Sequence, residues 1–171
     1  MLYTATYNSP LGKITLAEKN GKLVGLWFDD QKYFLSGIAE ETVPCESREI
    51  FVKVKDWLDR YFGGEAPSAD EIDTAPAGSD FRLTVWKILR EISYGETVTY
   101  GEIAKEAARR LGLGSMSAQA VGNAVGHNPI SVIIPCHRVV GANGSLTGYA
   151  GGIGKKQFLL RLEGVDISRF K

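Results

Sequence analysis

Near the middle of the C-terminal half of the chain, residues 128–140 read NPISVIIPCHRVV. The apolar run 130–134 is rich in β-branched residues and predicts a buried strand. Pro135 ends that strand, because proline has no backbone N–H and blocks a helix. Cys136 then lies at the strand end beside a histidine and an arginine. Such neighbours favour the thiolate, which is the reactive form of cysteine, so the stretch indicates a nucleophile.

The same residues also have a plainer interpretation, in which a buried structural cysteine is followed by a surface histidine and arginine. Adjacent residues of a strand point to opposite faces. His137 could therefore help Cys136 directly only where the backbone bends, or otherwise through a bridging water. For an isolated Cys-His pair the structural interpretation is favoured, so the surrounding sequence has to decide.

Two short helices joined by a glycine-containing turn are predicted just before this stretch. Thr99-Tyr100-Gly101-Glu102 fits a capping box that opens a helix ending near Arg110. Ser117 can cap a second helix from Ala118 to Val125. The pattern indicates a helix-turn-helix. Small residues on the second helix would allow close approach to a DNA groove, but taken alone they favour tight packing against a neighbouring helix.

The first 78 residues predict a separate β-rich domain. Alternating patterns and turn residues indicate three strands and one amphipathic helix, at Leu2–Tyr7, Lys13–Ala17, Leu23–Phe28 and Ile50–Phe62. Residues 65–79 are rich in Pro, Ala and Asp and are interpreted as a linker or a segment draped over a neighbour. We therefore expect two domains, 1–78 and 79–171, and the second opens with a helix from about Asp80 to Ile92.

Charge is distributed unevenly along the 171 residues, although the net charge is zero. From Ser79 onward there are 12 Lys and Arg against 7 Asp and Glu, and Ala107–Leu162 contains no carboxylate side chain. A surface that faces phosphates would lack acids, because each acid would repel the DNA backbone. Chance in a Gly- and Ala-rich region is the alternative explanation.

Several other classes are disfavoured by composition. Two cysteines and two histidines make neither a disulfide framework nor the spacing of a zinc site. No apolar run is long enough to cross a bilayer, and the N-terminus lacks the features of a signal peptide. We therefore expect a cytoplasmic protein with no metal, in which Cys45, beside an acidic residue, is structural.

The block from Phe81 to Val165 closely resembles the O6-alkylguanine-DNA alkyltransferase family. Four segments carry the resemblance, in the order found in the family: VWKILREISYGETVTYGEIA, AVGNAVGHNP, IIPCHRVVGANGSLTGYAGG and LLRLEG. Pro-Cys-His-Arg-Val preceded by Asn-Pro is a highly specific signature. Residues 1–78 match only in general character, as a small β-rich domain.

The resemblance implies a role for each catalytic residue. Cys136 corresponds to the alkyl acceptor, His137 to a base acting through water, and Glu163 to the carboxylate that orients and stabilises that histidine. Asn128 corresponds to the residue that ties the second helix to the active-site strand. Taken alone, Glu163 would be one more surface acid, and Asn128 part of an Asn-Pro turn.

The resemblance also implies a set of residues that contact DNA or the flipped base. Tyr100 corresponds to a tyrosine that rotates the target nucleotide, and Val139 with Val140 to the lining of the alkyl pocket. The remaining members of this set are Gly122 on the second helix, Arg138, and the glycine-rich loop residues Tyr149, Ala150, Gly151 and Gly152. Without the resemblance, these residues would be interpreted as core, helix surface and flexible turn.

Gln119 departs from the family pattern, which places an arginine at this position to fill the gap left by the flipped base. Glutamine is shorter and uncharged, so it can hydrogen-bond an orphaned base but supplies no cation. Extruding a base costs a few kcal/mol. Efficiency on duplex DNA is therefore the property that this departure puts in question.

The implied protein has an α+β fold, with a ribonuclease-H-like N-terminal sheet domain and a helical, winged helix-turn-helix-like C-terminal domain. It would act as a monomer on double-stranded DNA containing alkylated guanine, with O4-alkylthymine as a second candidate lesion. The alkyl group would pass to Cys136 once per molecule, without a cofactor. Two other classes remain open: a non-catalytic protein that flags lesions, which Gln119 slightly favours, and a helix-turn-helix regulator with an unreactive cysteine.

Overall fold

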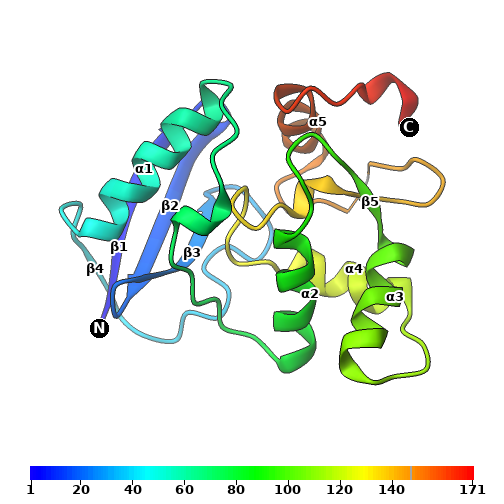
Figure 1. The fold of residues 1–171 in the computed structure, drawn as a ribbon. Helices are drawn as coiled ribbons and strands as arrows, with labels where there is room; N and C mark the ends of the chain where they lie inside the picture. The colour runs from blue at the N-terminus through cyan, green and yellow to red at the C-terminus, as the bar shows by residue number, and fades with distance from the viewer. Residues whose placement is uncertain (147) are drawn as a thin grey trace. The chain divides into compact units, whose positions relative to one another are not determined.

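The computed structural model describes residues 1–146 and 148–171, and it divides into two compact units. The first unit holds Met1–Ala77 together with Pro129–Ser131, and the second holds Gly78–Asn128 together with Val132–Lys171. The first is built on a sheet and the second mainly on helices (Figure 1). The α+β class predicted from the sequence is confirmed.

A four-stranded sheet forms the first unit, with strand order β3-β2-β1-β4. Its strands are β1 (Leu2–Ser9), β2 (Gly12–Lys19), β3 (Lys22–Phe28) and β4 (Thr42–Pro44). The first three were predicted, and Asn20-Gly21 makes the predicted tight turn with positive φ at both residues. The sequence did not reveal β4, because three residues show no alternation. It pairs parallel to β1 at the sheet edge, where a proline is tolerated.

Helix α1 (Glu49–Phe62) lies along β1 and β2 in Figure 1 and buries the predicted face, Val54, Trp57, Leu58 and Tyr61. Of residues 65–79, the part up to Ala77 belongs to the first unit, whereas Gly78 and Ser79 belong to the second. The short helix η1 (Ala69–Glu71) lies in the part up to Ala77, and the Trp57 indole N–H donates to the Ser68 carbonyl at 2.8 Å. The backbone N–H of Leu23 in β3 also donates to the Asp73 carbonyl at 2.9 Å.

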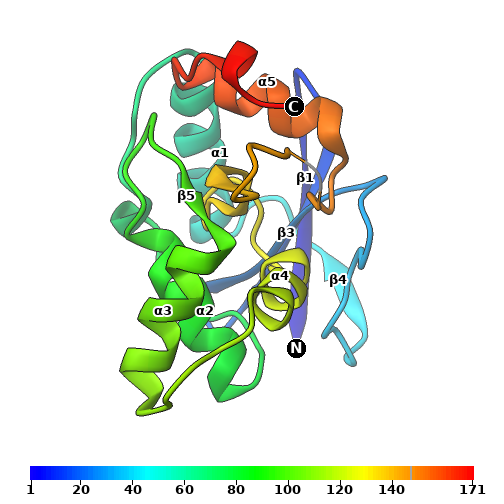
Figure 2. The same cartoon turned by 90° about the vertical axis from the view of Figure 1, so that its right-hand side faces the viewer.

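Three helices with side-chain caps open the second unit: α2 (Asp80–Arg90), α3 (Tyr100–Leu111) and α4 (Ala118–Gly126). Ser79 and Ser117 cap α2 and α4, and Thr99 with Glu102 makes the predicted capping box of α3. Gly112 ends α3 with a left-handed conformation, φ 68°. The three helices pack on one another, as Figures 1 and 2 both show. The predicted helix-turn-helix is therefore present.

The rest of the second unit surrounds a two-stranded parallel sheet of β5 (Val98–Thr99) and β6 (Val139–Val140). Between α4 and α5 (Ile153–Leu162) lies the short helix η2 (Cys136–Arg138), and η3 (Ile167–Arg169) is near the C-terminus. An apolar cluster of Val140, Leu146, Leu160 and Val165 fixes α5 beside β6. No helix in the described part of the chain is both long and apolar enough to span a bilayer.

The strand predicted at 130–134 is wrong. Only Ile130 makes a bridge, to Leu26, while residues 131–133 form turns and Ile134 a bend. Val132 has φ 69°, a left-handed conformation that is strained for a β-branched residue and incompatible with a strand. The run is apolar because all of it is buried, and burial alone does not distinguish a strand from other enclosed backbone.

Candidate active site

Cys136 begins the one-turn helix η2 instead of ending a strand. Its backbone N–H donates to the Ile134 carbonyl at 2.8 Å, and the residue is only 4% exposed. Successive residues of a 3₁₀ turn lie about 120° apart rather than on opposite faces. The turn therefore removes the opposite-face arrangement that a strand would impose on Cys136 and His137.

His137 and Glu163 form a buried pair. His137 Nε2 lies 2.6 Å from Glu163 Oε2, and both side chains are fully buried. Burial lowers the pKa of His137, although the neighbouring carboxylate opposes that shift. Glu163 itself follows the last turn of α5, which brings it to η2 from 26 residues further along the chain.

Arg138 fixes the position of the same carboxylate. Its Nε donates to Glu163 Oε1 at 2.8 Å, its Nη2 donates to Oε2 at 3.1 Å, and its Nη1 donates to the Ile92 carbonyl at 2.7 Å. The backbone N–H of Gly95 adds a bond to Oε1 at 3.1 Å. The guanidinium expected to contact DNA is thus engaged inside the protein, and its side chain is 11% exposed.

These partners keep Glu163 ionised. Burial by itself would raise the pKa of this carboxyl, but the hydrogen bonds and charges of His137 and Arg138 hold the pKa well below its usual value. A permanent negative charge beside His137 stabilises the imidazolium form. The arrangement is therefore suited to a histidine that takes up a proton during a reaction and releases it afterwards.

Asn128 connects α4 to the turn before Cys136. Its Nδ2 donates to the Ile134 carbonyl at 2.7 Å, which is the carbonyl that also accepts the Cys136 N–H. The Asn128 side chain in addition makes a hydrogen bond with the Cys136 thiol that lowers the thiol pKa. A single buried amide thus orients the backbone and the sulfur together.

Lys156 was missed by the sequence analysis. It is fully buried on α5, and its ammonium donates to the Val139 carbonyl. Burial lowers its pKa to about 8, and a charge on Cys136 opposes that shift. The available signal was helical spacing, because Lys156, Leu159 and Leu160 share the buried face of α5.

Cys136 rests as a thiol in this environment. Burial raises its pKa, and the opposing contributions from Asn128 and the Lys156 charge do not cancel that effect. A buried thiol with a raised pKa is not reactive by itself. The site therefore needs a base at the moment of reaction, and His137 is the neighbouring group that can act as one.

Tyr100, the first residue of α3, lies against two glycines. A Cβ atom added to Gly122 of α4 would lie 3.9 Å from the Tyr100 ring, and one added to Gly148 would lie 3.0 Å from its hydroxyl oxygen. Burial, and the negative charge that Cys136 carries when it ionises, raise the Tyr100 pKa to about 12. The three predicted elements, the tyrosine, the second helix and the glycine-rich loop, therefore meet at one place.

The other residues assigned to the base pocket are mostly enclosed. Val139 and Val140 are buried in β6, Tyr149 is 8% exposed, and Ala150 is half-buried. Gly151 packs so closely on the Tyr149 ring that an added Cβ would lie 2.7 Å from it. Gln119, by contrast, is exposed in the first turn of α4. Position 147, inside the predicted loop, is outside the described residues.

Comparison with known proteins identifies the family. The family model for the 6-O-methylguanine DNA methyltransferase DNA-binding domain matches residues 80–165, and the model for the ribonuclease-like domain matches residues 2–74. The chain belongs to the O6-alkylguanine-DNA alkyltransferase family.

Individual members of this family are similar over nearly their whole length. The methylated-DNA--protein-cysteine methyltransferase of Methanosarcina acetivorans is 45% identical over 166 residues, which are 95% of this chain and 99% of that protein. An OGT of Mycobacterium tuberculosis solved in complex with DNA is 41% identical, with a TM-score of 0.82 and coverage of 98% and 94%. An O6-methylguanine DNA methyltransferase from Methanococcus jannaschii is 30% identical, with a TM-score of 0.65 and coverage of 95% and 94%.

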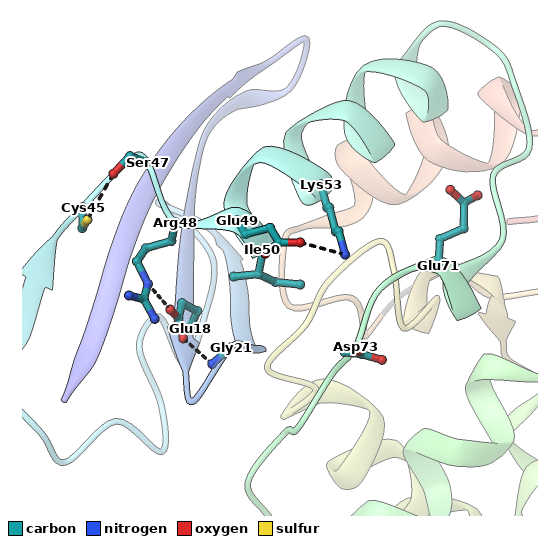
Figure 3. Close-up of a pocket in the computed structure, with 10 residues that line it drawn as sticks. All are labelled: Glu18, Gly21, Cys45, Ser47, Arg48, Glu49, Ile50, Lys53, Glu71 and Asp73. Atoms are coloured by element: carbon teal, nitrogen blue, oxygen red, sulfur yellow. Dashed lines mark hydrogen bonds and ion pairs between the residues drawn. The ribbon is translucent and has the colours of Figure 1, made fainter.

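A pocket of about 590 Å³ lies in the first unit of this alkyltransferase-family chain and contains none of the predicted site residues (Figure 3). Its charged side chains largely pair with one another or with nearby residues: Glu18 with Arg48, Lys53 with Glu49, and Glu71 with Arg60. Cys45 lines it, with its sulfur 3.6 Å from the Ser47 hydroxyl. In the described residues, no cluster of acids, histidines and cysteines could hold a metal ion.

Proposed function

We propose that this protein repairs alkylated DNA by transferring the alkyl group of O6-alkylguanine to the sulfur of Cys136. The observation that carries the proposal is the buried chain of contacts from Arg138 through Glu163 to His137, next in sequence to the only cysteine in the second unit. Membership of the alkyltransferase family and similarity to a relative solved with DNA support the same conclusion.

The first step is removal of the thiol proton. Nε2 of His137 is committed to Glu163, so Nδ1 is the nitrogen that would accept the proton from Cys136, through a water molecule. Glu163 stabilises the resulting imidazolium, and Arg138 prevents the carboxylate from turning away. The positive charge of Lys156 stabilises the thiolate that forms.

The second step is a displacement at the alkyl carbon. The Cys136 thiolate forms a C–S bond as the C–O6 bond of the guanine breaks. The departing guanine accepts a proton, for which Tyr100, with its hydroxyl beside the glycine-rich loop, is the candidate donor. The protein is left with an S-alkylcysteine and the DNA with guanine. A thioether is not reversed by any group in this site, so each molecule acts once and needs no cofactor.

DNA engagement falls to the helix-turn-helix. In this proposal α4 enters the minor groove, where small residues such as Gly122 permit close approach. Gln119 occupies the space left by the flipped base, Asn128 couples α4 to the reactive turn, and Val139, Tyr149 and Ala150 enclose the alkylated base. We also propose that the protein works in the cytoplasm, because both of its cysteines are free thiols, as is usual in a reducing compartment. We further propose that it acts as a monomer.

Intact-protein mass spectrometry after incubation with duplex DNA holding one O6-methylguanine tests the proposal. We expect a gain of about 14 Da, one methyl group in place of a hydrogen, that maps to Cys136. The gain should persist in Cys45→Ala and disappear in Cys136→Ala. Tight lesion binding without a mass gain would instead indicate a protein that flags lesions. The absence of both a binding preference for the lesion and a mass gain would overturn the repair function.

A further inference from the structure

Helix α4 presents an uncharged surface to its surroundings. Its sequence, AQAVGNAVG, contains no ionisable side chain. Val121, Ala124 and Val125 are buried, and the exposed residues are Ala118, Gln119 and Asn123. Gln119 and Asn123 are four residues apart and thus lie on one side of the helix, one turn from each other. A helix that enters a DNA groove on this side brings no cation of its own.

Arg82 brings a cation to the same side from helix α2. Its Nη2 donates to Asn123 Oδ1 at 3.3 Å. One turn further along α2, the buried Trp86 indole N–H donates to the Ala124 carbonyl at 2.9 Å. Successive turns of α2 are thereby tied to successive residues of α4, so the position of the guanidinium relative to α4 is fixed by the packing.

The guanidinium of Arg82 retains donors for a ligand. An arginine offers five N–H donors, and the bond to Asn123 uses one of them. Within the described parts of the chain, no carboxylate makes an ion pair with Arg82. The other arginines near the helix-turn-helix differ, because Arg109 and Arg110 are paired with Glu106. Arg82 is thus a positioned cation without an acidic partner.

We propose that Arg82 binds a phosphate of the DNA strand lying against α4, and that Asn123 is the residue that positions it. This inference rests on the proposed function of α4 in binding DNA. A fork of N–H donors beside an uncharged helix suits a phosphate, which accepts two of them at once. The contact would anchor the strand one helical turn from Gln119 and so compensate in part for the missing cation at that position.

The salt dependence of binding to an undamaged duplex measures this contact. Each phosphate neutralised contributes about −0.9 to the slope of log K against log salt concentration. Arg82→Gln should make that slope shallower by about one. The ratio of wild-type to variant affinity should therefore be roughly eightfold larger at 0.1 M salt than at 1 M salt. Arg82→Lys should keep the slope, because the charge remains. Asn123→Ala should also keep the slope but lose affinity, because the charge is no longer held in place.

Lys87→Gln is the matched control, since it removes one charge from the same helix at an exposed position about 140° around the axis. An unchanged slope in Arg82→Gln, or an equal change in Lys87→Gln, would overturn the inference. Methyl transfer from free O6-methylguanine, which carries no phosphate, should be insensitive to Arg82→Gln. If wild-type protein transfers no methyl group from any substrate, the proposed function fails, and the salt slopes still decide the role of Arg82.

Discussion

Each of the two units contains a buried glutamate held in nearly the same way. Glu18 of β2 is fully buried, accepts from Arg48 Nε and accepts the Gly21 backbone N–H at 2.9 Å. Glu163 is 5% exposed, accepts from Arg138 Nε at 2.8 Å and accepts the Gly95 backbone N–H at 3.1 Å. In both places a buried charge is made tolerable by an arginine and a backbone donor.

The two sites differ in which residues each hydrogen-bonded network reaches. Arg48 is 38% exposed and stacks over the ring of Tyr3, so the Glu18 network ends at the surface. The Glu163 network continues inward to His137, the residue that follows Cys136 in sequence. A buried ion pair is thus no sign of function by itself. In the proposed mechanism the Glu163 pair acts in catalysis because it controls the charge of His137, the residue next to the proposed nucleophile.

The largest expected effect separates the two glutamates. Glu163→Gln should slow methyl transfer to Cys136 by about two to three orders of magnitude, because the imidazolium of His137 loses its counter-charge. It should also cost about 3 kcal/mol of stability, since the charge of Arg138 is left buried without its partner. Glu18→Gln should lower the urea midpoint but leave the single-turnover rate of the folded protein unchanged. Equal rate losses in both variants would contradict the comparison.

Lys156→Met should slow transfer about tenfold at pH 7, because the positive charge that lowers the Cys136 pKa is removed. The effect depends on pH. Because the Lys156 pKa is about 8, the cation is present below that pH and lost above it. The advantage of wild type over Lys156→Met should therefore shrink between pH 7 and pH 9. A ratio of the two single-turnover rates that stays constant across this range would argue for a purely structural lysine.

Gln119→Arg tests helix α4, a part of the second unit that contains no charged side chain. The variant adds the cation that the family resemblance leads one to expect, so the flipped state should become more populated. We expect transfer from duplex DNA to become several-fold faster while transfer from free O6-methylguanine stays the same. If both substrates speed up equally, the substitution acts on the site rather than on base extrusion.

The smallest expected effect concerns stability in acid. The pKa of Glu163 is held below its usual 4.5 in the folded protein. Its carboxylate therefore stabilises the fold fully well above pH 4.5, and that contribution is lost progressively as pH falls from there toward the lowered pKa of the folded state. Wild type should lose more free energy of unfolding between pH 5 and pH 3 than Glu163→Gln does. Parallel curves from urea melts at these two pH values would count against the buried ion pair.

Local features of the fold were predictable because their causes are local. The alternation of β1 to β3, the apolar face of α1 and the caps at Thr99 and Ser117 depend on residues within a few positions of one another. The sequence likewise determined the candidate nucleophile, because the residues around Cys136 form a specific signature. It also carried the departure at Gln119, since that is a matter of residue identity alone.

Tertiary structure decided what depends on distant partners. The run 130–134 has the composition of a strand, yet Val132 takes a left-handed conformation, because its surroundings rather than its own preference set the backbone there. The engagement of Arg138 by Glu163, the burial of Lys156 beside Val139 and the hydrogen bond from Arg82 to Asn123 join residues 17 to 41 positions apart. Sequence supplies those charges, but only packing determines which of them meet, because the free energy of a buried charge depends on partners that no local pattern encodes.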